Sequence, residues 1–261
     1  MIDFHVHIFP ERIAGRTLEA LACVSHYVPF TTGTASGIME SAKEAGIETS
    51  VLLPVLTSPK QFESVHRFAM NFLDGPLLSF GGMHPECADY KEKLHQIKSW
   101  GFRGIKLHPD YQNTFFNDIR IQRILSFASE LGLIVVTHAG MDPAYPDCIH
   151  CTPKMIADVL DNVAPQKLVL AHMGGFQDLP GLEEYVIGRD VYLDTAMSFG
   201  RMTDADFVRI SRKHGIDKIL FATDSPWSGQ KESVAHLKQM DLTEEEQQKI
   251  LQNNAKNLLT E

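Results

Sequence analysis

Short apolar runs alternate with amphipathic stretches from one end of the chain to the other. The apolar runs are rich in Val, Ile, Leu and Phe and are bounded by Gly, Pro or Asp, which is typical of β-strands. Several, such as Leu-Ile-Val-Val at 133–136, are apolar throughout, as in parallel strands that are covered on both faces. The pattern predicts eight strands, at 2–8, 47–55, 77–84, 104–108, 133–138, 167–172, 191–196 and 218–224.

Amphipathic stretches lie between the apolar runs and predict helices. Ser58-Pro59 is a good N-cap and first-position pair, and Gly46, Gly101 and Gly132 each stand where a helix is expected to end. The helices are expected at 35–45, 59–73, 88–100, 118–131, 153–163, 178–187, 204–214, 228–240 and 243–259. The longest irregular stretches are 9–34 and 139–152, and long loops on the active face of a barrel usually cover or shape the site.

Strands that alternate with helices predict a parallel sheet with the helices outside it. Eight such units in 261 residues favour an α/β fold, a single (β/α)8 TIM barrel with an extra C-terminal helix. An open doubly wound sheet is the alternative, and it is disfavoured because no Gly-rich dinucleotide turn follows the first predicted strand. Since the sequence has no repeat, low-complexity tract or flexible linker, residues 1–261 are expected to form one domain.

Composition and charge limit which binding partners and which cellular compartment are expected. The formal net charge is −9, which disfavours nucleic acid as a partner because binding it needs a basic face. No apolar stretch is long enough to span a bilayer, and no basic cluster or N-terminal targeting segment is visible, so no membrane partner is expected. Four cysteines do not make a disulfide framework, which favours a cytoplasmic setting, and the sequence leaves a homodimer open.

Titratable side chains gather at the carboxyl ends of the predicted strands, where barrel active sites lie. In the first strand, His5 and His7 are two residues apart, which places both imidazoles on one face. The other strands that end this way carry Lys106 and His108, His138, His172 and Asp224. A single histidine at a strand end is more often a structural residue than a metal ligand. Five strands that end in titratable residues on one rim are harder to explain as part of the hydrophobic core. Buried titratable groups cost free energy unless they are paired or bound to a metal.

The donor types in this set suit a divalent transition metal. We expect His5, His7, His138 and Asp224 to hold one ion, with zinc favoured and manganese, iron or cobalt as alternatives. Such an ion would activate a water for attack on a substrate carbonyl. Asp224 is expected both to bind the metal and to accept the proton of the water, whereas His172 either is a further ligand or polarises the reacting group of the substrate.

The same residues, in strand order over the whole chain, resemble the amidohydrolase superfamily. The motif Phe-Ala-Thr-Asp-Ser-Pro-Trp at 221–227 and the closing segment 250–259 are similar to the amidohydrolase-related (amidohydrolase 2) branch, which includes decarboxylases and a lactonase. The resemblance implies one metal on the two strand-1 histidines, the strand-5 histidine and the strand-8 aspartate, with His172 acting on the substrate. A second metal is less favoured.

Lys106 has three competing roles. By resemblance to binuclear members it would be a carboxylated bridge between two metals; otherwise it binds a substrate carboxylate or pairs with an internal acid, and these two roles are preferred. His108 and His84 are candidates for lining the substrate pocket, each with a structural role as the alternative. Asp194 is a weaker candidate, with either a supporting or a structural role. The lone C-x-x-C at 148–151 is weak support for a zinc or redox site, so a loop cysteine pair is the preferred interpretation.

Three functions are open to such a site. The preferred one is a metal-dependent hydrolase that uses metal-activated water on a small-molecule amide, lactone or ester, with a substrate that bears a carboxylate. A metal-dependent decarboxylase of a small unsaturated or aromatic carboxylate is the alternative. A metal-bound sensor or scaffold is disfavoured, because a degenerate site would be expected to lose at least one of its competent residues.

Overall fold

The structure is a computed structural model that describes residues 1–260, and the contacts of the chain divide it into two compact units. Unit 1 contains Met1–Leu52, Asp74–Leu78 and the chain from Asp194 onward. Unit 2 contains Leu53–Leu73 and Ser79–Leu193. Each unit is described by itself.

Unit 1 is built on parallel strands that lie side by side. β1 (Ile2–Val6) pairs with β2 (Thr49–Leu52), and the sheet continues to β3 (Leu77–Ser79). On the other side of β1 runs the segment that begins as β9 (Ile219–Leu220), because the Phe4 N–H donates to the Phe221 carbonyl at 2.9 Å and Val6 bridges Ser225 in parallel. The polar motif that follows β9 is therefore held against the first strand.

Unit 2 carries strands that pair in sequence order, all parallel. They are β4 (Gly81–Gly82), β5 (Gly104–Leu107), β6 (Ile134–Thr137), β7 (Leu168–Leu170) and β8 (Tyr192–Asp194). One row of paired residues crosses them, from Gly82 through Lys106, Val136 and Val169 to Tyr192. The strands thus end near one level, which brings the residues after them together.

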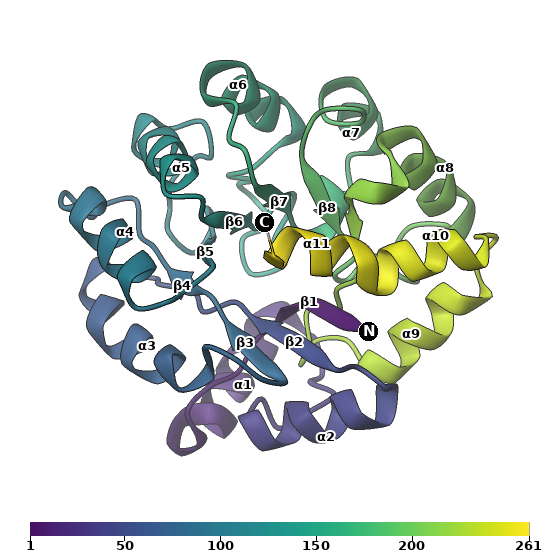
Figure 1. The fold of residues 1–261 in the computed structure, drawn as a ribbon, viewed down its shortest axis with the longest axis horizontal. Coiled ribbons are helices and arrows are strands. Elements are labelled where there is room, and N and C mark those ends of the chain that lie inside the picture. Colours follow the sequence, from purple (N-terminus) through teal and green to yellow (C-terminus); the bar gives the residue numbers. More distant parts are fainter. Residues whose placement is uncertain (261) are drawn as a thin grey trace. The chain divides into compact units, whose positions relative to one another are not determined.

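Helices of unit 2 follow one another around its strands (Figure 1). They are α3 (Phe62–Ala69), α4 (Tyr90–Ser99), α5 (Ile119–Glu130), α6 (Pro153–Val163) and α7 (Leu179–Tyr185), with short 3-10 turns at Pro59–Gln61, Met70–Phe72 and His172–Gly174. From α4 to α7, each helix packs on the next. α5 shows why they attach: Ile121, Ile124, Leu125 and Ala128 recur at helical spacing and are buried.

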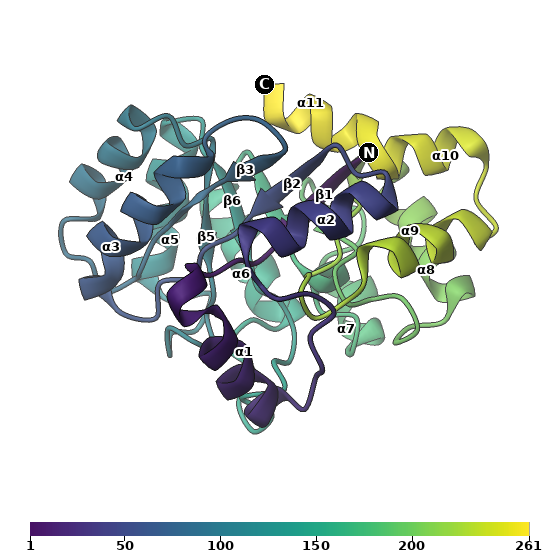
Figure 2. The same ribbon diagram turned by 90° about the horizontal axis from the view of Figure 1, so that it is seen from below.

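Unit 1 has its own helices, at α1 (Glu11–Ser25), α2 (Ala35–Ala45), α8 (Asp204–His214), α9 (Gln230–Gln239), α10 (Glu244–Gln248) and α11 (Asn254–Thr260). A 3-10 turn at Ile216–Lys218 and a π-helical segment at Lys249–Asn253 complete them. α2 and α9 lie side by side (Figures 1 and 2), and α11 contacts β1 and β9.

Three helices have the bounds that the sequence predicts: 35–45, 153–163 and 204–214. Each begins after a threonine, Thr34, Thr152 or Thr203, whose side chain accepts a hydrogen bond from a backbone N–H of the first turn. Two of them end at Gly46 and Gly215, both with positive φ. Local capping chemistry therefore fixes these helices.

The prediction that 9–34 is irregular is wrong, because α1 occupies residues 11–25. Only Ala14 and Leu18 of this helix are buried. An apolar strip as narrow as this, with Gly15 inside it, gives a weak periodic signal. The stretch 139–152 does lack helix and strand, as predicted.

Predicted strands are longer than the observed ones. β1 ends at Val6 and β9 at Leu220, so His7 and Asp224 lie beyond the strands that were expected to contain them. The predicted strand 77–84 is divided into β3 and β4 by Phe80, and the predicted helix 243–259 is interrupted by its π-helical segment. Backbone hydrogen bonds continue past both strand ends, from the His7 N–H to the Ser225 carbonyl and from the Asp224 N–H to the His5 carbonyl, so the paired segments are longer than the regular strands.

Candidate metal centre

Two imidazoles and one carboxylate converge in unit 1. The Nε2 atoms of His5 and His7 are 3.1 Å apart, and Asp224 Oδ1 lies 3.1 Å from His7 Nε2 and 3.5 Å from His5 Nε2. Donor atoms about 2.0–2.1 Å from a tetrahedral zinc ion are separated by about 3.3 Å. These three residues therefore fit a divalent ion by both donor type and spacing.

The backbone around this cluster fixes the ligands. The Asp224 N–H donates to the His5 carbonyl at 2.8 Å, and the His7 N–H donates to the Ser225 carbonyl at 2.7 Å. Asp224 has a φ of 65°, in the left-handed region that few residues other than glycine adopt. Backbone in such regions costs free energy and concentrates at functional sites. The conformation turns the carboxylate out of the β9 segment toward the two imidazoles.

Asp194 stands behind His5. Its Oδ2 lies 2.9 Å from His5 Nδ1, and its Oδ1 accepts from the Ala196 N–H at 3.0 Å. Both side chains are almost fully buried. A carboxylate at this position keeps the proton on Nδ1, which leaves the lone pair of Nε2 for a metal. The supporting role expected of Asp194 is thus consistent with its position.

A buried carboxylate, Asp3, joins β1 to the segment before Asp224. Asp3 accepts from Thr223 Oγ1 at 2.6 Å, Thr223 N at 3.0 Å, Gln230 Nε2 at 2.8 Å and the His5 N–H at 3.3 Å. Burial raises the pKa of Asp3 to about 7, and these hydrogen bonds oppose the rise. Asp3 is one of the polar residues that hold this cluster, and no site motif in the sequence marked it.

A second group of imidazoles lies in unit 2. His138 Nδ1 and His172 Nε2 are 3.1 Å apart, with ring planes at 63°. His172 has a φ of 57°, again in the left-handed region. Behind His138, Asp110 Oδ2 lies 3.5 Å from Nε2, and the Asp110 side chain is fully buried. The pair thus presents two convergent nitrogens, as a shared ion or a shared proton requires.

His108 packs on His138 in a different way. Their rings stack with centroids 4.3 Å apart at 13°, and His108 Nε2 lies 3.5 Å from Asp142 Oδ2. His108, His138 and Asp142 come close enough to suggest an ion of their own. Sequence reasoning missed Asp142, because it lies in the irregular stretch after β6.

Lys106 and His84 are the remaining candidates for substrate binding, and they lie in different surroundings. Lys106 lies in β5 and is 1% exposed, which is costly for a charged amine unless other groups compensate it. His84 Nδ1 accepts a hydrogen bond from the Glu86 N–H at 3.2 Å, and burial lowers the pKa of His84. That bond fits the alternative in which His84 braces its own loop.

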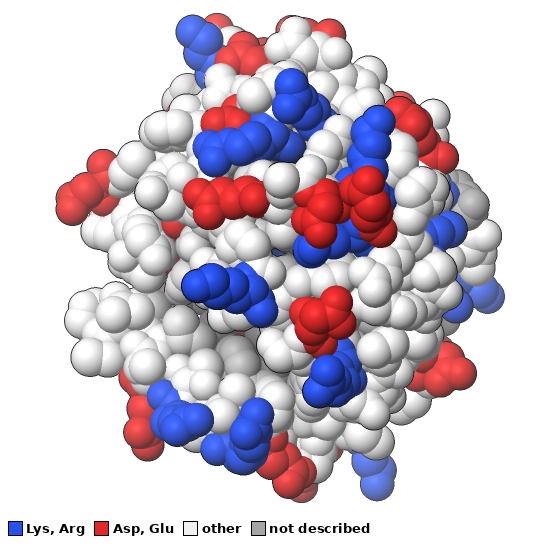
Figure 3. Space-filling view, turned by 90° about the vertical axis from the view of Figure 1, so that its left-hand side faces the viewer, with Lys and Arg blue, Asp and Glu red and all other residues white. Residues whose placement is uncertain are grey.

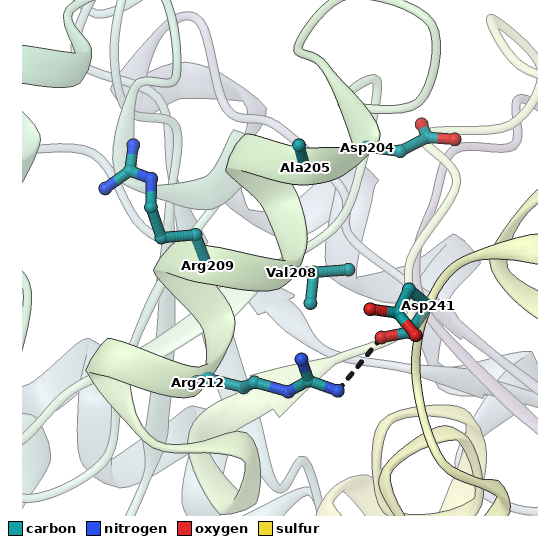
Figure 4. A pocket seen from close by; sticks show the side chains of 6 residues that line it. All are labelled: Asp204, Ala205, Val208, Arg209, Arg212 and Asp241. Carbon is teal, nitrogen blue, oxygen red and sulfur yellow. Dashed lines mark hydrogen bonds between the residues drawn. The ribbon is translucent and has the colours of Figure 1, made fainter.

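One face of the surface and one hollow lie apart from the predicted site residues. Figure 3 shows Lys and Arg side chains interspersed with Asp and Glu on the face that it displays. A hollow over α8 is lined by Asp204, Ala205, Val208, Arg209, Arg212 and Asp241, with Arg212 donating to the Asp241 carbonyl (Figure 4). None of these six is a predicted site residue.

No helix within residues 1–260 has the length and apolar character needed to cross a membrane.

Comparison with known proteins identifies the family of this chain. A family model described as Amidohydrolase matches residues 2–260. The chain belongs to the amidohydrolase family. Membership confirms the resemblance that the strand-end residues and the eighth-strand motif indicated. A search of curated proteins found no match.

Solved structures of other proteins share the fold. An uncharacterised TIM-barrel protein from Bordetella bronchiseptica is 21% identical, with a TM-score of 0.79 over 100% of this chain and 98% of that one. A dihydroxybenzoic acid decarboxylase from Polaromonas, with bound manganese and the inhibitor 2-nitroresorcinol, is 17% identical, with a TM-score of 0.69 over 99% and 96%. A probable 2-pyrone-4,6-dicarboxylic acid hydrolase from Acinetobacter baumannii, with citric acid bound, is 17% identical, with a TM-score of 0.67 over 100% and 99%.

Identities this low show the fold alone. The fold is the (β/α)8 TIM barrel that the alternating pattern predicts, in an α/β chain of parallel strands. The amidohydrolase family contains hydrolases, and its fold is shared by decarboxylases, so the family makes this chain an enzyme candidate without fixing the reaction.

Proposed function

We propose that this chain is a metal-dependent hydrolase of a small amide, lactone or ester. The observation that carries the proposal is the convergence of His5, His7 and Asp224 on a point with ligand spacing. His138 is the fourth proposed ligand, on the family pattern. Zinc is the preferred ion because imidazole and carboxylate donors suit it, and manganese, iron and cobalt are alternatives. The manganese in the Polaromonas decarboxylase supports a divalent ion in this fold.

A divalent ion bound there supplies a nucleophile at neutral pH, since it lowers the pKa of a water ligand toward roughly 7. Asp224 accepts the proton of the attacking water. His172 donates a hydrogen bond to the oxygen on which negative charge develops in the transition state. Asp194 maintains the tautomer of His5 through its 2.9 Å contact with Nδ1.

The proposed substrate is small and bears a carboxylate. Lys106 is the group proposed to bind that carboxylate, with His108 and His84 lining the pocket. The citric acid bound to the Acinetobacter protein and the dicarboxylic acid in its description support an anionic ligand for this fold.

Replacement of Asp224 by Asn tests the proposal. An amide cannot accept the proton, so turnover on a panel of amides, lactones and esters should fall by about 10²-fold or more while the protein stays folded. Asp217→Asn is the matched control, because Asp217 is a surface carboxylate of the same unit, paired with Lys249. Substantial turnover by the Asp224→Asn variant would overturn the assignment of Asp224 as the base.

Decarboxylation is the second candidate, favoured by the decarboxylase of the same fold that binds 2-nitroresorcinol. In this reaction the metal would hold the substrate carboxylate and an adjacent oxygen. Incubation with aromatic and enoic carboxylates, with measurement of released CO₂, separates the two functions. Release of CO₂ without ester or lactone hydrolysis would replace the first proposal, and the absence of release across the panel would exclude the second.

A further inference from the structure

A cysteine and a histidine that the proposed metal chemistry does not use form a chain of contacts in unit 2 with Asp110, which also lies 3.5 Å from the proposed ligand His138. Cys148 and His150 lie in the irregular stretch between β6 and α6, and Asp110 follows β5. Cys148 Sγ is 3.8 Å from His150 Nε2, and His150 Nδ1 is 2.9 Å from Asp110 Oδ1. The three side chains therefore stand in the order thiol, imidazole, carboxylate.

The contacts define which nitrogen of His150 can act as a base. Asp110 Oδ1 also accepts the backbone N–H of His150 at 3.1 Å. The backbone N–H and the ring of His150 therefore contact the same carboxylate oxygen, which fixes the orientation of the ring relative to Asp110. Because Asp110 Oδ1 already acts as an acceptor for the His150 N–H, the proton of neutral His150 lies on Nδ1, which points at the same oxygen. The lone pair of Nε2 then faces the thiol. Phe115 fixes the ring from the side, since its own ring stacks on His150 at 4.8 Å and 30°.

Exposure separates Cys148 and Cys23 from the other two cysteines. Cys148 and Cys23 are exposed, whereas Cys87 and Cys151 are buried and burial raises the pKa of both buried thiols. Cys23 lies on α1 and, within residues 1–260, makes no hydrogen bond to a histidine. The chain thus contains two accessible thiols, of which one faces an oriented imidazole.

We propose that Cys148 is a nucleophilic thiol, with His150 as its base and Asp110 as the group that positions the base. A nucleophile within reach of a base that a third group orients is the arrangement used in covalent catalysis. Sγ forms a bond to an electrophilic carbon, the bond from that carbon to its leaving group breaks, and the thiol proton passes to His150 Nε2. Phe115, Tyr145 and Ile149 are exposed apolar side chains of the same loops, which favours a small uncharged carbon electrophile.

Alkylation by iodoacetamide tests the inference with an internal standard. The electrophile forms a thioether at Sγ and releases iodide, and peptide mass spectrometry gives a rate for each cysteine of the intact chain. Each rate in the folded protein is divided by the rate of the same cysteine in urea. We expect a ratio of about ten or more for Cys148 and a ratio of one or less for Cys23, because a placed base accelerates proton removal.

His150→Asn tests the base. The Asn amide still donates toward Asp110 but removes Nε2, so the ratio for Cys148 should fall to that of Cys23. His236→Asn is the matched control, because His236 also pairs with an aspartate, Asp204, at 2.8 Å, and faces no cysteine in the described chain. In the His236→Asn variant, the folded-to-urea rate ratio for Cys148 should match that of the unchanged protein.

Two results would overturn the inference. One is a ratio for Cys148 no higher than that for Cys23 in the unchanged protein, which needs no variant. The other is an unchanged Cys148 ratio in a folded His150→Asn variant, where the buried Cys87 and Cys151 remain unlabelled.

Discussion

Carboxylates stand behind two histidines that carry the proposed chemistry. Asp194 contacts Nδ1 of His5 at 2.9 Å, and Asp110 lies 3.5 Å from Nε2 of His138. An imidazole can bind a metal only through the nitrogen that lacks a proton, so a carboxylate on one nitrogen decides which atom faces the ion. The two residues of unit 1 in this arrangement are 189 positions apart in sequence. Sequence pattern places His5 and Asp194 on two predicted strands, but it carries no information on which side chain touches which.

Asp194→Asn tests the importance of this orientation. The Asn Oδ1 can still accept from the Ala196 N–H, but its amide N–H₂ would face His5 Nδ1. A donor at that position favours the proton on Nε2, the atom that the metal needs. We expect zinc affinity to fall by about 10–100-fold, measured by competition with a chromogenic chelator.

Asp217→Asn, which replaces an exposed carboxylate of the same unit, should leave the affinity unchanged. If Asp194→Asn retained the original affinity, Asp194 would be a structural residue and the tautomer of His5 would have another cause.

At the scale of helices and strands, local chemistry determined how much could be predicted. α2, α6 and α8 were predicted to the residue, since threonine caps start them and two end at positive-φ glycines. α1 was missed because only Ala14 and Leu18 face the core. The same limit applies to the site residues. The histidines at the strand ends could be predicted from the hydrophobic pattern, whereas Asp142 could not, because it lies in a stretch with no periodic signal.

An ion pair between α8 and α10 is expected to make the stability of the fold depend on pH in the acid range. Arg212 binds both carboxylate oxygens of Glu246, at 2.8 Å and 2.9 Å. The Arg212 hydrogen bond is the largest cause that lowers the pKa of Glu246, from 4.5 to about 2. Because the folded pKa is depressed, the stability from this pair is present above pH 4.5 and is lost as the pH falls toward 2.

Glu246→Gln should therefore lower the melting temperature at pH 6 by about 1–3 °C, a modest change because the pair is solvent-accessible. Gln can preserve the capping box with Thr243, so the helix start is not altered. The difference from the unchanged protein should shrink as the pH falls from 5 to 3 in calorimetry. Glu244→Gln, in the same first turn, is the control, and an equal pH dependence in both variants would contradict the account.

At the scale of the whole molecule, the bound metal is expected to contribute to stability. A ligand that binds only the folded state stabilises it by about 2.7 kcal/mol at 100 times its Kd. For a chain of this size, zinc added to metal-free protein should raise the melting temperature by about 5–10 °C. His7→Ala should lose most of that increase, since it removes one of three convergent donors, while His236→Ala, which alters a surface histidine, should retain it.

Elemental analysis of the same samples determines the number of ions. One metal per chain, lost in His7→Ala, is the result that the His5, His7 and Asp224 cluster predicts. Two per chain would instead favour the role of Lys106 as a carboxylated bridge, because a carbamate anion can be shared by two ions. A chain that takes up no ion under metal-replete conditions would contradict the proposed hydrolase at its first step, since the spacing of its ligands would then serve hydrogen bonding alone.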